Sequence, residues 1–170
     1  LNSIKEQTYK NYEIIVVDGN SIDGTKKEII KRKKTISKFV IEKDRGIYHA
    51  MNKGIKMSSG KWIIFMNSGD LFYKKNVLYN FLSEDVKNYD IVYGNTLVSA
   101  KNFKYIVNSK PFDDKTLLMP FCHQSVFVKS NILKKRNFSL TYKFSSDFDF
   151  FYYCYSSRKK FRKIDHIIAK

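Results

Sequence analysis

The chain has 170 residues, 43% hydrophobic and 16% aromatic, a composition that excludes a disordered chain and suits one domain with a packed core. No apolar run approaches the ~20 residues needed to cross a bilayer. The longest runs, Ile14–Val17 and Trp62–Met66, have the length of strands. The two cysteines, Cys122 and Cys154, do not make a disulfide framework and lack a metal-binding spacing, so we expect a reduced, cytoplasmic protein.

The net charge is +16, from 32 basic and 16 acidic residues. A chain of this charge attracts polyanions such as nucleic acid, anionic lipid headgroups or phosphorylated substrates. The lysines are spread along the whole chain rather than clustered, so a solvated basic surface without a ligand is an equal alternative. The first residues have the pattern of an amphipathic helix rather than that of a signal peptide.

Helical and strand-like patterns alternate along the chain. In chain order they predict a helix at 1–7, a strand at 13–17, a helix from 24 or 25 to 34, a strand at 39–42, a helix at 47–57, a strand at 61–66, a helix at 76–86 and a strand at 90–94. They continue with a hairpin or meander at 96–107, a short helix at 113–118, a strand at 124–128, a helix at 132–135, an aromatic-rich helix at 148–157 and a strand at 164–168. We expect Asp23 and Ser130 to cap the helices that follow them. Strands alternating with helices indicate parallel βαβ units, and therefore an α/β domain with a mostly parallel sheet flanked by helices.

Three polar loops follow predicted strands, at 18–23, 44–46 and 67–70. Each contains Asp, which supplies a charged oxygen, and Gly, which lets the backbone approach a ligand closely. A single Asp-Gly pair is a turn more often than a site. Open α/β sheets bind ligands outside the carboxyl ends of their strands, so three such loops at one edge favour a ligand site there.

The sequence argues against a P-loop ATPase or a dinucleotide dehydrogenase, because neither glycine-rich phosphate motif is present. A phosphate-bearing ligand would then need another source of positive charge. Mg²⁺ or Mn²⁺ serves this purpose when held by one or two carboxylates together with the substrate's phosphates. Asp70 is placed for that role, and the alternative is a helix cap or turn residue.

Three blocks of the sequence, in order, resemble family 2 glycosyltransferases of the GT-A fold. They are VVDGNSIDGT at 16–25, DRGIYHAMNKGI at 44–55 and SGKWIIFMNSGD at 59–70. The likeness continues more loosely through 89–95, 122–129 and 145–151. It implies a Rossmann-like fold that binds a nucleoside-diphosphate sugar, and it is nearest to the branch that builds bacterial capsule, exopolysaccharide and lipopolysaccharide.

The resemblance implies a role for each loop. Asp18 would lie at the base or ribose of the nucleotide, and Asp44 and Arg45 in the donor loop. Asp70 matches the last carboxylate of the family's DxD-type motif, which binds Mg²⁺ or Mn²⁺ on the diphosphate. Asn67 and Gly69 stand in this motif where many relatives have Asp. Asn67 is expected beside the donor, while Asp70 holds the metal as the single carboxylate.

Asp147 matches the segment in which the family keeps its catalytic base. An acceptor hydroxyl must lose a proton as it attacks the anomeric carbon, and a nearby carboxylate can take it. The alternative for Asp147, which does not exclude the first, is a cap of the following helix. His123, Gln124 and Asp149 are expected on the acceptor side, although a lone His before a strand is more often structural.

We expect one glycosyltransferase domain over 1–170, with a nucleotide-sugar-binding half at 13–95 and an acceptor-side half at 96–170. The family begins with a strand that precedes the helix on which this sequence opens, and it continues beyond 168. The resemblance therefore implies that residues 1–170 lack a central strand of the family's sheet, so the strands on either side of it lack hydrogen-bond partners. It also implies weak sugar transfer by residues 1–170 alone.

Two other functions remain open at this stage. A non-catalytic basic module would bind nucleic acid or anionic membrane, with aromatic side chains stacked on bases, but the aromatic residues lie in apolar runs typical of a core. A glycosidase also uses paired carboxylates, and the donor-type loops argue against it. For the leading hypothesis we expect a nucleoside-diphosphate sugar, a glycan or lipid-linked acceptor and no nucleic acid as partners. Contact with the inner face of an anionic membrane would gain about 1 kcal/mol per basic residue.

Overall fold

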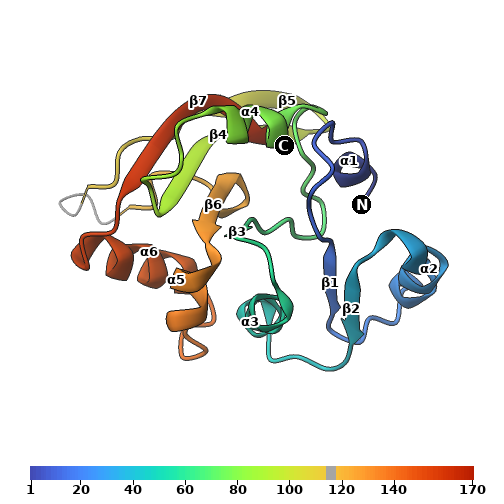
Figure 1. Ribbon diagram of the computed structural model, residues 1–170. Coiled ribbons are helices and arrows are strands. Elements are labelled where there is room, and N and C mark those ends of the chain that lie inside the picture. The colour runs from blue at the N-terminus through green and yellow to red at the C-terminus, as the bar shows by residue number, and fades with distance from the viewer. Residues whose placement is uncertain (114–117) are drawn as a thin grey trace.

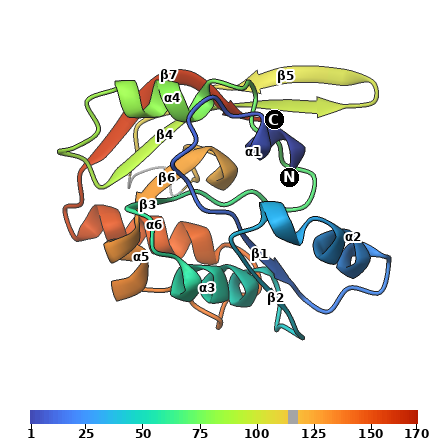
Figure 2. The ribbon, with the colours of Figure 1, turned by 45° about the vertical axis from the view of Figure 1, so that its right-hand side comes forward.

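The computed structural model describes residues 1–113 and 118–170, so the helix expected at 113–118 lies largely outside the described residues. The helices are α1 (Asn2–Lys5), α2 (Thr25–Lys31), α3 (Ile47–Met57), α4 (Val77–Ser83), α5 (Ser130–Lys135) and α6 (Ser146–Ser156), with the short 3-10 helices η1 (Lys33–Thr35) and η2 (His123–Ser125). The strands are β1 (Ile15–Asp18), β2 (Lys38–Ile41), β3 (Trp62–Ile63), β4 (Ile91–Ala100), β5 (Phe103–Val107), β6 (Val126–Lys129) and β7 (Phe161–Ala169). Figures 1 and 2 show their arrangement.

The strands form two sheets. β1 and β2 make a parallel two-stranded sheet, and a five-stranded sheet has the order β3-β6-β4-β5 with β7 beside β4. In the larger sheet only β4 and β7 are parallel, while the other pairs are antiparallel. The α/β class is confirmed, but the expectation of a mostly parallel sheet is wrong for the larger sheet. The reason is that β6 inserts antiparallel between β3 and β4, and a tight turn joins β4 to β5, which only antiparallel strands allow.

Two helix starts differ in detail from expectation. Asp23 accepts hydrogen bonds from the amide and hydroxyl of Thr25, at 3.0 and 2.6 Å, but Gly24 occupies the cap position of α2. Ser130 is the first residue of α5 rather than its cap, which is Lys129. Both helices are short, so packing rather than capping holds them in place.

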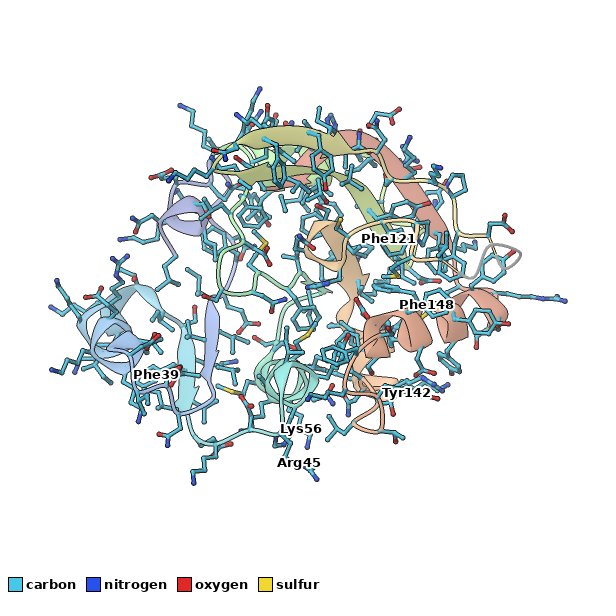
Figure 3. All side chains as sticks on the ribbon, turned by 180° about the vertical axis from the view of Figure 1, so that it is seen from behind. Phe39, Arg45, Lys56, Phe121, Tyr142 and Phe148 are labelled. Atoms are coloured by element: carbon cyan, nitrogen blue, oxygen red, sulfur yellow. The ribbon has the colours of Figure 1, made fainter. Side chains whose placement is uncertain are left out.

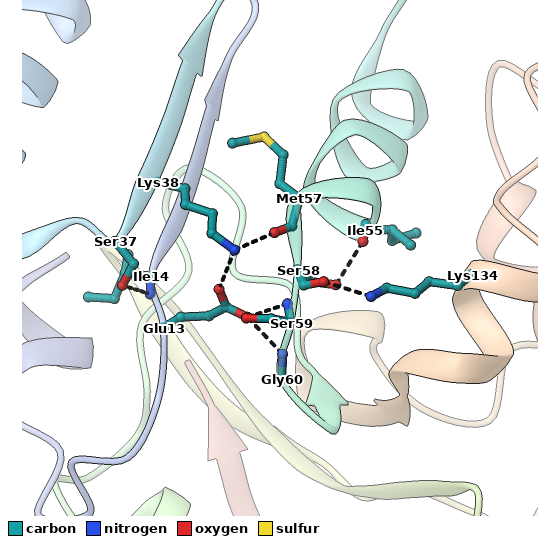
Figure 4. Close-up of polar contacts among 10 residues, drawn as sticks. All are labelled: Glu13, Ile14, Ser37, Lys38, Ile55, Met57, Ser58, Ser59, Gly60 and Lys134. Carbon is teal, nitrogen blue, oxygen red and sulfur yellow. Dashed lines mark hydrogen bonds and ion pairs between the residues drawn. The ribbon is translucent and has the colours of Figure 1, made fainter.

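Glu13 joins the two-stranded sheet to the rest of the molecule (Figure 4). Its carboxylate accepts hydrogen bonds from the amides of Ser59 and Gly60, at 2.6 and 2.8 Å, and Lys38 of β2 lies 3.1 Å away. Burial alone would raise the pKa of Glu13, but these donors outweigh it and lower the pKa to about 2. One carboxylate thus connects β2 with the segment between α3 and β3.

A cavity of about 940 Å³ lies between β1 and the segment at 62–67. Apolar side chains form much of its wall, including Val17 on one side and Phe65 on the other. In the described part of the chain β1 pairs only with β2 and β3 only with β6, and both strands line the cavity. The strand expected at 61–66 is shortened to Trp62–Ile63 because residues 64–66 find no strand to pair with there.

The aromatic residues of α6 belong to the main core. Phe150 and Phe151 are buried, and Phe121 packs edge-to-face on Phe151 with ring centroids 5.0 Å apart. Figure 3 shows Phe121 close to Phe148, which belongs to this helix. Side chains packed in this core are not available to stack on bases, which weakens the case for a nucleic-acid module. No described helix has both the length and the apolar character required to cross a bilayer.

Candidate functional site

The last residue of β1, Asp18, holds the loop that follows the strand. Asp18 is buried, and its two carboxylate oxygens accept hydrogen bonds from the amide and the hydroxyl of Ser21, at 3.0 and 2.6 Å. Gly19 lies against the next loop, because a Cβ added there would be 2.5 Å from Oδ2 of Asp44. The segment after β1 and the loop that contains Asp44 are therefore in direct contact, and a side chain at Gly19 would have to displace the Asp44 carboxylate.

The loop after β2 leads directly into α3. Asp44 accepts a hydrogen bond from the amide of Gly46 at 2.9 Å, and Gly46 has a φ of 108°, which favours glycine. His49 accepts a bond from the amide of Arg45 at 3.1 Å through Nδ1. The exposed side chain of Arg45 lies at the outer edge of the molecule (Figure 3). His49 thus fixes the backbone of the loop at 44–46, just before α3.

Asp70 closes a tight turn after β3. Its Oδ2 accepts a hydrogen bond from the amide of Asn67 at 2.9 Å, and its own amide donates to the carbonyl of Asn67 at 3.0 Å. Burial raises the pKa of Asp70, and the Asn67 amide and the nearby His123 only partly oppose this rise. Burial disfavours the charged form of this carboxylate, and a cation bound nearby would stabilise that form.

A metal at Asp70 would be held by few protein groups. No cluster of three His, Cys, Asp or Glu side chains suited to a metal occurs within residues 1–113 and 118–170. Asp70 fits the mode in which one carboxylate and the substrate's phosphates bind Mg²⁺ or Mn²⁺ together.

His123 lies between the Asp70 turn and Asp147. Its Nε2 is 2.7 Å from Nδ2 of Asn67, and its Nδ1 is 3.4 Å from Oδ2 of Asp147. One ring therefore contacts both the turn that carries Asp70 and the residue expected as the base.

Asp147 lies in the first turn of α6, while Ser145 takes the cap position. Its Oδ1 accepts hydrogen bonds from the phenol of Tyr48 at 2.8 Å and from the amide of Phe148 at 3.0 Å. Burial tends to raise the pKa of Asp147, but the contacts with His123, Tyr48 and the Phe148 amide outweigh it and lower the pKa. The carboxylate is therefore charged near neutral pH, and Oδ2 keeps room for a further hydrogen bond beside His123.

Other expected acceptor residues lie differently. The carboxylate of Asp149 is paired with the guanidinium of Arg136 at 3.1 Å, so it does not join the group around Asp147. Gln124 is half-buried in η2, next to His123.

Tyr48 contacts the group around Asp147, and the sequence did not single it out. It belongs to the first turn of α3, directly after the donor loop, and its place inside a motif block was the available signal. Through α3 the donor loop and Asp147 are connected: His49 contacts Arg45, and Tyr48 contacts Asp147.

Comparison with known proteins agrees with this α/β fold. The sequence profile of glycosyl transferase family 2 matches residues 1–164, so the chain belongs to that family. The PGL/p-HBAD biosynthesis glycosyltransferase of Mycobacterium tuberculosis is 28% identical over 178 residues, which cover 99% of this chain and 68% of the relative. An uncharacterized glycosyltransferase of Methanocaldococcus jannaschii is 28% identical over 186 residues, which cover 100% of this chain and 63% of the relative.

Solved structures share the fold. TarS 1-349 of S. aureus in complex with UDP-GlcNAc has a TM-score of 0.75 at 17% identity, covering 99% of this chain and 52% of that one. The mannosyltransferase PcManGT of Pyrobaculum calidifontis, in complex with GDP-Man and Mn²⁺, has a TM-score of 0.72 at 18% identity, covering 98% of this chain and 50% of that one. The chain therefore has the GT-A fold and spans about half the length of these structures.

Proposed function

We propose that this chain forms the donor-binding and catalytic part of an inverting glycosyltransferase. It moves a sugar from a nucleoside-diphosphate sugar to a hydroxyl of a glycan or lipid-linked acceptor in bacterial surface polysaccharide synthesis. The observation that carries the proposal is the position of His123, which contacts both the Asp70 turn and Asp147. A donor site and a base are thereby held side by side.

Both halves of the domain contribute to the site. Asp18, Asp44 and Asp70 come from the donor half at 13–95, whereas His123 and Asp147 come from the acceptor half at 96–170. Arg45, in the loop that Asp44 begins, is placed to approach the donor from outside. The structures with the same fold support a nucleotide-sugar donor, since TarS and PcManGT were each solved with a nucleotide sugar.

Asp147 takes the proton of the acceptor hydroxyl on Oδ2 as the hydroxyl oxygen attacks the anomeric carbon. The new carbon–oxygen bond forms as the bond to the diphosphate breaks, and the diphosphate leaves with the electron pair. A single displacement of this kind inverts the anomeric configuration. His123 and Tyr48 orient the carboxylate and keep it charged before the reaction. Asp70, with Asn67 beside it, would hold Mg²⁺ or Mn²⁺, which when bound stabilises the charge on the departing diphosphate.

The test is transfer of labelled sugar from UDP-GlcNAc or GDP-mannose to extracted lipid-linked glycans, with the anomeric configuration of the product read by NMR. Asp147→Asn should lower transfer about 10²–10⁴-fold, the usual contribution of a general base. The matched control is Asp149→Asn in the same helix, whose partner is Arg136, and it should retain activity within a few-fold. Undiminished transfer by Asp147→Asn, or retention of configuration, would refute the proposal.

A further inference from the structure

The β4–β5 hairpin projects beyond the strands that pack beside it. β4 pairs with β6 over Ile91–Tyr93 and with β7 as far as Thr96, so the part from Leu97 onward pairs only with β5. A turn at 101–102 joins the two strands, and β5 is an edge strand of the sheet. Figure 2 shows the hairpin extending away from the rest of the molecule. We call residues 97–107 the aromatic hairpin.

The aromatic hairpin exposes large apolar side chains. Phe103, Tyr105 and Ile106 are 56%, 53% and 46% exposed, although they sit in one short strand. Phe103 and Tyr105 point to the same face, where their rings stack with centroids 5.9 Å apart. β5 pairs with β4 on one side, and its other side is a free edge in the described part of the chain. Exposed apolar side chains gathered on such an edge strand indicate a contact surface rather than a solvated one.

The charged residues of the aromatic hairpin are all basic. No acidic residue occurs anywhere between Asp90 and Asp113, whereas Lys101, Lys104 and Lys110 lie in or next to the hairpin. Lys101 and Lys104 are exposed. Lysines beside exposed aromatic and aliphatic side chains suit the interface of an anionic bilayer, where the cations meet headgroups and the rings enter the acyl boundary.

From these observations we propose that the aromatic hairpin docks the protein on an anionic membrane surface. The base of the hairpin adjoins the proposed site, because Thr96 and Ser125, near His123, are joined by a hydrogen bond of 2.6 Å. Docking there holds the acceptor side close to the bilayer. The inference deepens the proposed function, since it rests on an acceptor presented at a membrane.

Two other contacts fit the observations less well. Edge pairing of β5 with a second copy would bring together two chains that each carry a net charge of +16, and it would place identical lysines close to one another. A second exposed apolar group, formed by Ile22, Ile30 and Phe39 near α2, is accompanied by basic residues but also by the exposed acids Asp23 and Glu28. Its mixed charge suits an anionic bilayer less than the aromatic hairpin does.

Vesicle flotation tests the proposal, with vesicles of phosphatidylcholine alone or with about one third phosphatidylglycerol. The wild type should bind the anionic vesicles and release them as salt rises from about 0.1 to 0.5 M. Lys101→Gln with Lys104→Gln should weaken the partition coefficient about 25-fold, since each basic residue contributes about 1 kcal/mol, or about fivefold. Phe103→Ser with Tyr105→Ser should weaken it at least about tenfold.

The matched control is Lys33→Gln with Lys34→Gln, which removes the same charge beside α2, and it should change binding less than about twofold. Equal loss in this control, or equal binding to neutral vesicles, would overturn the proposal. So would a dimer in sedimentation velocity that the Phe103 and Tyr105 substitutions dissociate. Circular dichroism should give unchanged melting for all variants, because the substituted side chains are exposed. Binding of UDP-GlcNAc or GDP-mannose should stay unchanged in all variants. A wild type that binds these nucleotide sugars but not the anionic vesicles would contradict the docking surface and not the transferase.

Discussion

The phenol of Tyr48 donates a 2.8 Å hydrogen bond to Oδ1 of Asp147, although the two residues are 99 positions apart in the sequence. The bond joins the first turn of α3 to the first turn of α6. The loop that holds Asp44 leads into the same turn of α3, so the position of the donor loop and the orientation of the carboxylate depend on one helix end.

Tyr48→Phe removes this hydrogen bond and leaves the ring in place. We expect kcat to fall about tenfold with an unchanged KM for the donor, because a hydrogen bond to a charged group is worth about 1.5–3 kcal/mol. The hydrogen bond from Tyr48 helps to lower the pKa of Asp147, so its loss should also shift the acidic limb of the kcat profile to higher pH. The control is Tyr79→Phe, an exposed tyrosine on α4, and a shift of equal size there would contradict the role of Tyr48.

His123→Gln should lower kcat about 10–100-fold, because the ring that contacts both Asn67 and Asp147 is lost. The pKa of Asp147 should rise, which again moves the acidic limb of the rate profile upward. His166→Gln is the comparison, since His166 lies 3.2 Å from Glu84 and outside the proposed site. If both variants retain full activity with the wild-type pH profile, His123 is only structural.

Gly19→Ala should disturb the donor loops, because its Cβ would lie 2.5 Å from the Asp44 carboxylate. The added methyl group would displace that carboxylate at a cost of about 1–3 kcal/mol, so we expect the affinity for nucleotide sugars to fall about fivefold or more in calorimetric titrations. Gly54→Ala in α3 is the control: its nearest contact is Val17 at 3.7 Å, and alanine there should stabilise the helix by about 0.5–1 kcal/mol. Unchanged donor affinity in Gly19→Ala would show that the loops tolerate separation.

Glu13→Gln should destabilise the fold, since the neutral amide loses the attraction to Lys38 and accepts its hydrogen bonds more weakly. The folded-state pKa of Glu13 is about 2, below its ordinary value of 4.5. Its contribution to stability is therefore complete above pH 4.5 and is lost as the pH falls toward 2.

In urea unfolding, the free energy of unfolding of Glu13→Gln should be about 1–2 kcal/mol lower than that of the wild type at neutral pH. This difference should shrink in acid. Glu6→Gln, at an exposed position of the same chain, should unfold like the wild type at both pH values. A constant difference between Glu13→Gln and wild type at every pH would contradict the assigned pKa.

The sequence was informative where structure is local. Asp18, Asp44 and Asp70 follow apolar runs. The structure places Asp18 at the end of β1, Asp44 in the loop after β2 and Asp70 in a turn beyond β3, because run length and turn residues act over a few positions. The insertion of β6 beside β4 and the bond from Tyr48 to Asp147 depend on contacts between distant segments. The periodicity of apolar residues does not report such contacts. For this reason the prediction of a mostly parallel sheet was wrong for the larger sheet, and Tyr48 was not predicted.

The most direct test of the central claim is calorimetric binding of UDP and GDP with and without Mn²⁺, in the wild type, in Asp70→Asn and in the control Asp165→Asn on exposed β7 surface. We predict that Mn²⁺ strengthens binding at least about tenfold in the wild type and in the control, and has no effect in Asp70→Asn. Equal, metal-independent affinity in all three proteins would contradict a donor site built on Asp70.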